Sequence, residues 1–117
     1  MVAVETVDLA KQIVEAAVGK QATDVVLLDT RNVCSFADYF VICSGESERQ
    51  IEAIGQAVTE VLDRESAYLH HREGTADSGW VLFDLGDIVV HIFSSFEREY
   101  YQLDSLWSKA PVVVRIM

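Results

Sequence analysis

Two aspartates three residues apart, Asp84 and Asp87 in the stretch DLGD, are the first candidates for chemistry in this sequence. Carboxylates are ligands that magnesium prefers, but a magnesium site needs further oxygen ligands that converge on the ion. Gly86-Asp87 is also a typical pair for a tight turn between two strands. The spacing therefore favours a turn over a metal site.

The segment SGES, residues 44–47, could bind phosphate at the start of a helix, because backbone N–H groups there favour anions. Glu46 and Glu48 place negative charge beside that position and offset the gain from the helix dipole. Ser47 and Gln50 instead fit a capping box, in which both side chains satisfy free backbone donors. We expect a helix to begin here without a phosphate site.

Histidines and cysteines are the remaining candidates for ligands or nucleophiles. Cys34 and Cys43 are nine residues apart, which matches neither a C-x-x-C redox pair nor a zinc knuckle, so two buried thiols are expected. His70 and His71 would point to opposite faces of a strand, so at most one of them could join His91 and a cysteine in a zinc site. The sequence has no nucleophile elbow and no glycine-rich phosphate loop. We expect no catalytic residue, no metal site and no cofactor.

Hydrophobic periodicity predicts the elements that would position these residues. Apolar residues at helical spacing precede Gly19, which is placed to end the first helix as a left-handed cap. The strand DYFVICSG is apolar enough to be buried on both faces. The expected elements are helices over 6–18 and 47–64 and strands over 24–30, 38–45, 66–71, 80–85 and 88–93.

The stretch WVLFDLGDIVVHIF, residues 80–93, is predicted to form a β-hairpin with Gly86-Asp87 as a type II′ turn. One face of this hairpin is uniformly apolar and belongs in the core. The opposite face pairs Trp80 with Phe93, Leu82 with His91, and Asp84 with Val89. Because that face mixes aromatic, charged and aliphatic residues, it is typical of a surface that something else covers.

The sequence does not determine which segment, if any, packs on this second face. Two long helices precede the hairpin, and two helices cover about one face of a four- or five-stranded sheet. We therefore expect an open second face that binds a partner. The alternative is that the tail FEREYYQLDSLW, which ends at Trp107, folds as a short helix back over Trp80.

The composition limits the class of protein. The chain has 117 residues and a formal net charge of −10, from 19 acidic and 9 basic residues. Nucleic-acid readers usually carry a basic stripe, so direct nucleic-acid readout is disfavoured and a basic protein partner is favoured. No run approaches the ~18 apolar residues of a membrane span, and the start lacks a targeting pattern. We expect one domain over 1–117, in the cytoplasm, without a membrane partner.

Three motifs resemble the ribosomal silencing factor family, also called RsfS or Iojap: DYFVICSGESERQIEAI, WVLFDLGDIVVHIF and REYYQLDSLW. The resemblance covers nearly the whole chain, with Phe83 where the family commonly has Leu. It implies an α+β fold, a mixed β-sheet in the order α-β-β-α-β-β, related to nucleotidyltransferases but without their catalytic carboxylates. The family's motif positions found here are Asp38, Tyr39, Ser44, Gly45, Ser47, Arg49, Gln50, Trp80, Asp84, Asp87, His91, Glu97, Arg98, Tyr100 and Trp107.

The resemblance also implies a function. It implies a translation repressor, not an enzyme, that binds the large ribosomal subunit through its ribosomal protein L fourteen. Binding there would block joining of the small subunit and lower translation under nutrient limitation. The residues expected to contact the partner are Trp80, Leu82, Asp84, His91, Phe93, Glu97, Arg98 and Tyr100.

Two alternatives from other classes stay open. An active nucleotidyltransferase-like enzyme would need two carboxylates one residue apart to hold magnesium, and no Asp-x-Asp pair occurs in the sequence. A homodimeric adaptor would use the same sheet face to bind a second copy of itself. The free protein could thus be a homodimer.

Overall fold

A six-stranded mixed sheet organises residues 5–102 and 108–116, the part of the chain that this computed structural model describes. The strand order is β3-β4-β5-β2-β1-β6, and every neighbouring pair is antiparallel except β2 and β5. The fold is α+β, as the sequence predicts. The elements are α1 (Thr6–Gly19), β1 (Thr23–Asp29), β2 (Tyr39–Gly45), α2 (Glu48–Arg64), β3 (His71–Glu73), the 3₁₀ helix η1 (Ala76–Ser78), β4 (Trp80–Asp84), β5 (Ile88–Ser94), α3 (Ser95–Tyr101) and β6 (Val112–Ile116).

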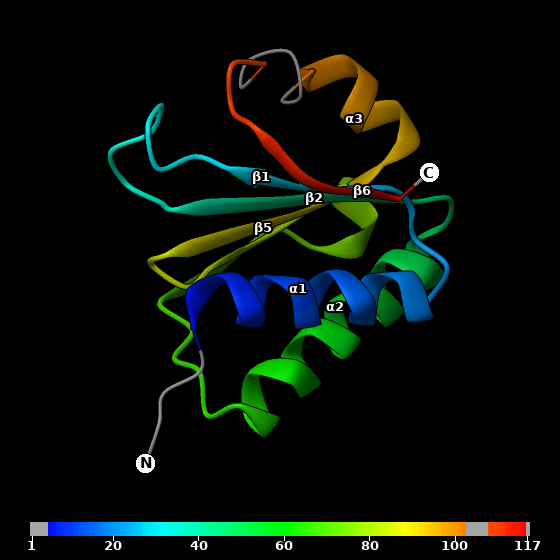
Figure 1. Cartoon of the computed structure of the whole chain (residues 1–117). Helices are drawn as coiled ribbons and strands as arrows, with labels where there is room; N and C mark the ends of the chain where they lie inside the picture. Colours follow the sequence, from blue (N-terminus) through cyan, green and yellow to red (C-terminus); the bar gives the residue numbers. More distant parts are fainter. Residues whose placement is uncertain (1–4, 103–107, 117) are drawn as a thin grey trace.

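The two long helices cover one face of the sheet. Figure 1 shows α1 and α2 together below the strands and α3 above them. The helices bury their apolar stripes against alternate residues of β1, β2, β4 and β5, which form the larger core. Every residue of β2 is buried, because the strand lies in the middle of the sheet and is covered on both faces. This confirms the expectation for DYFVICSG.

The C-terminal end of α1 differs from the sequence-based expectation. Gly19 is the last residue of α1 and not its left-handed cap, so that expectation is wrong. The helix closes through bonds from Gln21 N–H to the Val18 carbonyl and from Ala22 N–H to the Ala17 carbonyl. These bonds place the positive φ, 63°, on Gln21, two residues later than expected.

The start of α2 confirms the capping prediction in a modified form. The Ser47 hydroxyl accepts a hydrogen bond from Gln50 N–H at 3.1 Å. The Gln50 side chain reaches one residue further back than in the standard box and accepts from Glu46 N–H at 2.7 Å. Its amide also donates to the carbonyls of Lys20 and Gln21. One side chain therefore joins the start of α2 to the turn after α1.

The hairpin has the predicted register, with Trp80 opposite Phe93, Leu82 opposite His91 and Asp84 opposite Val89. Leu85 N–H donates to the Ile88 carbonyl at 2.9 Å, and Gly86 has a φ of 88°, as the first central residue of the predicted turn requires.

Two strands differ from the expectation. The short strand lies at His71–Glu73 and not over 66–71, because it pairs with the end of β4, where Glu73 lies opposite Leu82. The strand β6 was not predicted. It pairs with β1 at the edge of the sheet, and because none of its residues is fully buried it lacks the alternation that marks a strand in a sequence.

Candidate functional site

A second apolar layer lies on the face of the sheet opposite α1 and α2. Phe40 and Phe93 are almost completely buried in it, so the expectation of a wholly open second face is wrong. Trp80 and Leu82 pack against this layer but stay half-buried. The layer consists of Val26, Leu28, Ala37, Phe40, Ile42, Val89, Phe93 and Ala110.

The indole of Trp80 is held on three sides. Its Nε1–H donates a hydrogen bond to Nδ1 of His91 at 3.2 Å. Its ring stacks on Phe93, with centroids 4.9 Å apart, and contacts the ring of Tyr101 at 4.7 Å. The side chain therefore has one defined orientation at the border between the buried layer and the surface.

His91 lies beneath Trp80 and is 5% exposed. Burial lowers the pKa of its imidazole to about 4, so the ring is neutral at pH 7. Because Nδ1 accepts from Trp80, the proton of the neutral ring lies on Nε2, which has no hydrogen-bond partner among the described residues. The ring edge packs against Phe40, with centroids 5.2 Å apart. His91 thus acts as a buried acceptor that orients Trp80.

The short helix α3 closes one side of this region. Ser94 caps it, because its hydroxyl accepts from Glu97 N–H at 3.1 Å. Arg98 fixes the helix to the sheet by donating to the Asp24 carbonyl and, at 3.1 Å, to the Ser44 hydroxyl. This arrangement turns Glu97, like Tyr101, toward Trp80.

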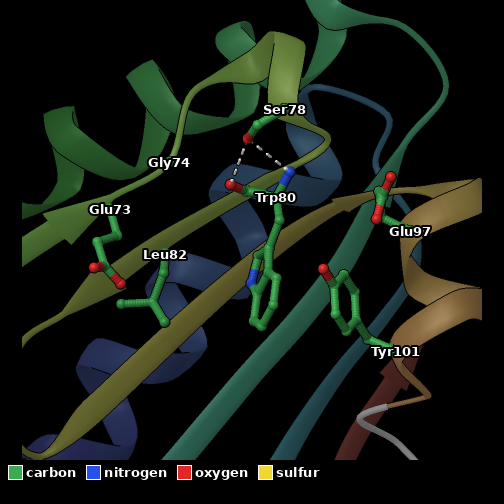
Figure 2. A pocket seen from close by; sticks show the side chains of 7 residues that line it. All are labelled: Glu73, Gly74, Ser78, Trp80, Leu82, Glu97 and Tyr101. Atoms are coloured by element: carbon green, nitrogen blue, oxygen red, sulfur yellow. Dashed lines mark hydrogen bonds between the residues drawn. The ribbon is translucent and has the colours of Figure 1, made fainter.

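A hollow of about 350 Å³ opens between β3, η1, β4 and α3. Figure 2 shows the Trp80 ring at its centre, Tyr101 and Glu97 on the α3 side, and Leu82 and Glu73 on the β3 side. We name this hollow the Trp80 pocket. It is lined by Glu73, Gly74, Ser78, Trp80, Leu82, Glu97 and Tyr101.

The structure brings three of the predicted contact residues together in this pocket, namely Trp80, Leu82 and Glu97. His91 and Phe93 lie underneath it, so they support the surface from below in this conformation. Whether any of these residues contacts a partner stays a prediction.

The other three predicted contact residues lie outside the pocket. Asp84 ends β4, opposite Val89 as predicted, and its carboxylate accepts a hydrogen bond from Gly86 N–H in the turn at 2.8 Å. Arg98 is bonded within the chain. Tyr100 is 71% exposed and stacks on Phe96 on the outer side of α3, with the ring planes 8° apart.

Four residues of the pocket escaped the sequence analysis, namely Glu73, Gly74, Ser78 and Tyr101. Tyr101 is four residues after Glu97, so a helical reading of the tail would have placed both on one side of that helix. Glu73 comes next to Leu82 only through the pairing of β3 with β4. The alternative of a tail helix over Trp80 is present in part, because α3 contacts the indole through Tyr101 but leaves it half-buried, whereas Trp107 lies outside the described residues.

The remaining candidates for chemistry stay dispersed. Within residues 5–102 and 108–116, no three His, Cys, Asp or Glu side chains are placed to hold a metal ion. Burial raises the pKa of the Cys43 thiol to about 12, which leaves little thiolate at pH 7. None of the helices described is long and apolar enough to cross a membrane.

Comparison with known proteins points in one direction. A family model described as "Ribosomal silencing factor during starvation" matches residues 3–116. The chain is 42% identical to the ribosomal silencing factor RsfS of Bacillus subtilis over 80% of this chain and 79% of that protein. It is 41% identical to the RsfS of Halalkalibacterium halodurans over 91% of each.

Solved structures resemble the fold as well. A crystal structure of a Chromobacterium violaceum protein matches with a TM-score of 0.85 at 30% identity, over 90% of this chain and 88% of that one. A crystal structure from Bacillus halodurans matches with a TM-score of 0.81 at 38% identity, over 93% and 99%.

Proposed function

This chain belongs to the ribosomal silencing factor family, and from that membership we propose that it represses translation by binding the large ribosomal subunit and blocking the joining of the small subunit. Membership of this family supports a role in regulating translation at the ribosome. The family consists of regulators rather than known enzymes. The finer proposal is that ribosomal protein L fourteen is the contact on the large subunit, that repression accompanies nutrient limitation, and that the protein acts in the cytoplasm.

The observation that carries this proposal is the oriented, half-buried Trp80. A large aromatic side chain with a fixed rotamer loses little entropy on binding, and such residues often dominate interfaces. The hydrogen bond to His91 and the stack on Phe93 hold the indole in place before a partner arrives. The net charge of −10 favours a basic partner, and ribosomal proteins are commonly basic.

The test uses purified large subunits. Wild-type protein should sediment with them and slow the light-scattering signal of subunit joining. Trp80→Ala should weaken binding by about 30-fold, because a buried aromatic anchor contributes ~2 kcal/mol or more. Since Trp80 is only half-buried, its loss should cost less than the roughly 3–5 kcal/mol of a core aromatic, so the variant should still fold.

Tyr68→Ala is the matched control. Tyr68 is 74% exposed and lies beside Leu85 and Ile88, residues of the helix-covered core, so its loss removes an aromatic ring from elsewhere on the surface. This variant should bind and inhibit like the wild type. Equal binding by Trp80→Ala and wild type, at a temperature where both are folded, would exclude Trp80 as the anchor.

The two alternatives give different results in the same experiments. A homodimeric adaptor would show a mass that rises with concentration and falls on Trp80→Ala, with no effect on subunit joining. An active nucleotidyltransferase would transfer labelled nucleotide in the presence of magnesium and lose that activity on Asp84→Asn. Either result would replace the repressor proposal.

A further inference from the structure

We propose that the Trp80 pocket receives a single arginine side chain of the protein partner, with its guanidinium over the Trp80 ring in a hollow whose charged lining residues are Glu73 and Glu97. This inference rests on the proposed function, because it specifies the chemistry of the partner at the same surface. The pocket combines an aromatic floor, two acidic walls and no basic lining residue.

The charge of the pocket favours a cation. All seven lining residues are described, and the two charged ones are both glutamates. The arginine side chains of β3 and α3 are directed elsewhere, while the imidazole Nε2 of His71 lies 3.6 Å from the Glu73 carboxylate. Arg72 lies over the ring of Phe83, on the face that α1 and α2 cover, at 5.0 Å from its centroid. Arg98 is bonded to the backbone of Asp24 and to Ser44.

The aromatic floor favours the same guest. A cation within about 6 Å of an indole centroid is attracted by the negative face of the ring. The ring planes of Trp80 and Tyr101 are tilted by 47° to each other. Together they form an angled aromatic surface for a planar group. Leu82 offers apolar surface for the aliphatic stem of a long side chain.

The backbone places Glu97 for this role. Gly79 has a φ of 81°, and a Cβ at that position would lie 2.6 Å from Cγ of Glu97. The absence of a side chain at Gly79 therefore lets the stem of Glu97 lie against the loop before β4. Glu97 is also half-buried, which lowers the entropy lost when its carboxylate binds a donor.

Arginine fits better than lysine because the two carboxylates flank the ring on opposite sides in Figure 2. A guanidinium has five donors in a plane, so it can stack on the indole and still donate to a carboxylate at its edge, whereas an ammonium is a compact, strongly hydrated charge. The pocket thus selects a planar cation.

The test follows the indole N–H signal of Trp80 by ¹⁵N NMR, with Trp107→Phe used to tell the two indoles apart. The probe is N-acetyl-argininamide, and the matched neutral probe is N-acetyl-citrullinamide. All titrations are run at one fixed pH, because the exposed His71 lies 3.6 Å from Glu73. The arginine probe should shift the signal saturably and bind about tenfold more tightly than the citrulline probe.

The double variant Glu73→Gln/Glu97→Gln should weaken the arginine probe by about tenfold or more, since it keeps the shape and removes the charge. Glu52→Gln/Glu60→Gln, on α2, should leave it unchanged. Equal binding of the arginine and citrulline probes, or tighter binding of N-acetyl-lysinamide, would overturn the proposal. So would an unchanged affinity in the double variant.

Sedimentation with large subunits separates this inference from the proposed function. If both hold, the double variant loses the arginine probe and also binds the subunits more weakly by about tenfold. If only the inference fails, the wild type and the double variant bind the subunits equally well. If only the proposed function fails, the wild type binds the arginine probe but not the subunits.

Discussion

The pair formed by His91 and Trp80 shows how a buried residue can fix the orientation of a half-buried one. His91 is neutral and buried, and it has Nδ1 free to accept the indole N–H. A second proton on the ring would turn this acceptor into a donor and place a charge beside Phe40 and Phe93, where the imidazole is only 5% exposed to solvent. The orientation of Trp80 therefore depends on the protonation state of His91.

This pair predicts a pH dependence of stability. The folded pKa of His91, about 4, lies below the ordinary 6.5, so between these values the unfolded chain binds a proton that the folded chain does not. The stability that comes from neutral His91 is complete above pH 6.5 and is lost as the pH falls toward 4, by at most about 3 kcal/mol. Urea unfolding of wild type and His91→Phe over this range measures it.

The variant should show a shallower decline than the wild type, because phenylalanine keeps the ring and removes the titration. His71→Phe is the control for the loss of an exposed histidine and should follow the wild-type curve. Identical slopes for wild type and His91→Phe would contradict a buried neutral imidazole.

At the scale of elements, the start of α2 and the end of α1 are joined by one side chain. The oxygen of Gln50 accepts from Glu46 N–H, and its amide donates to Gln21 O at 2.8 Å and Lys20 O at 3.2 Å. The carbonyls after α1 would otherwise lack this partner at the point where the chain turns into β1. Gln50 is therefore more than a cap, because it also sets the spacing between two elements.

We expect Gln50→Ala to lower the free energy of unfolding by about 1–2 kcal/mol, because it removes these bonds together. Gln50→Glu should also destabilise, since it retains an acceptor for Glu46 but sets a carboxylate against two carbonyls. Arg49→Ala, at the exposed neighbouring position, should change stability by less than about 0.5 kcal/mol. Urea denaturation distinguishes the three variants, and equal effects of Gln50→Ala and Arg49→Ala would refute the joint role.

At the scale of the whole molecule, the net charge of −10 creates a long-range field around the Trp80 pocket. The two faces of the sheet differ in how much of them is covered. Two long helices cover one face, and the short α3 covers only part of the other. The uncovered part carries half-buried apolar residues among carboxylates. On such a surface, charge raises the rate of association with a partner, and apolar contact lengthens the lifetime of the complex.

Binding to large subunits should therefore weaken as salt rises, mainly through the association rate, because screening acts beyond about 8 Å at physiological ionic strength. Stopped-flow mixing at low and high salt measures both rates. Tyr68→Ala should show the same salt slope as the wild type, since it leaves the charge unchanged. An association rate that is independent of salt would contradict the contribution of the acidic surface.

The sequence alone determined the features that depend on local pattern. The alternation of WVLFDLGDIVVHIF defines both faces of the hairpin and its register, and Ser47 with Gln50 defines the start of α2. These features are predictable because neighbouring residues fix the turn and the cap. The end of α1 was not predictable in this way, because its closing hydrogen bonds place the residue with positive φ at Gln21 and not at Gly19.

Only the tertiary structure decided how the second face is used. It buries His91 and Phe93, leaves Trp80 half-buried, and brings Glu73 and Tyr101 to the same pocket from β3 and α3. It also adds β6 beside β1 at the edge of the sheet. Periodicity shows which residues of an element share a face, but the burial of that face depends on segments far away in the sequence, whose packing no local pattern contains.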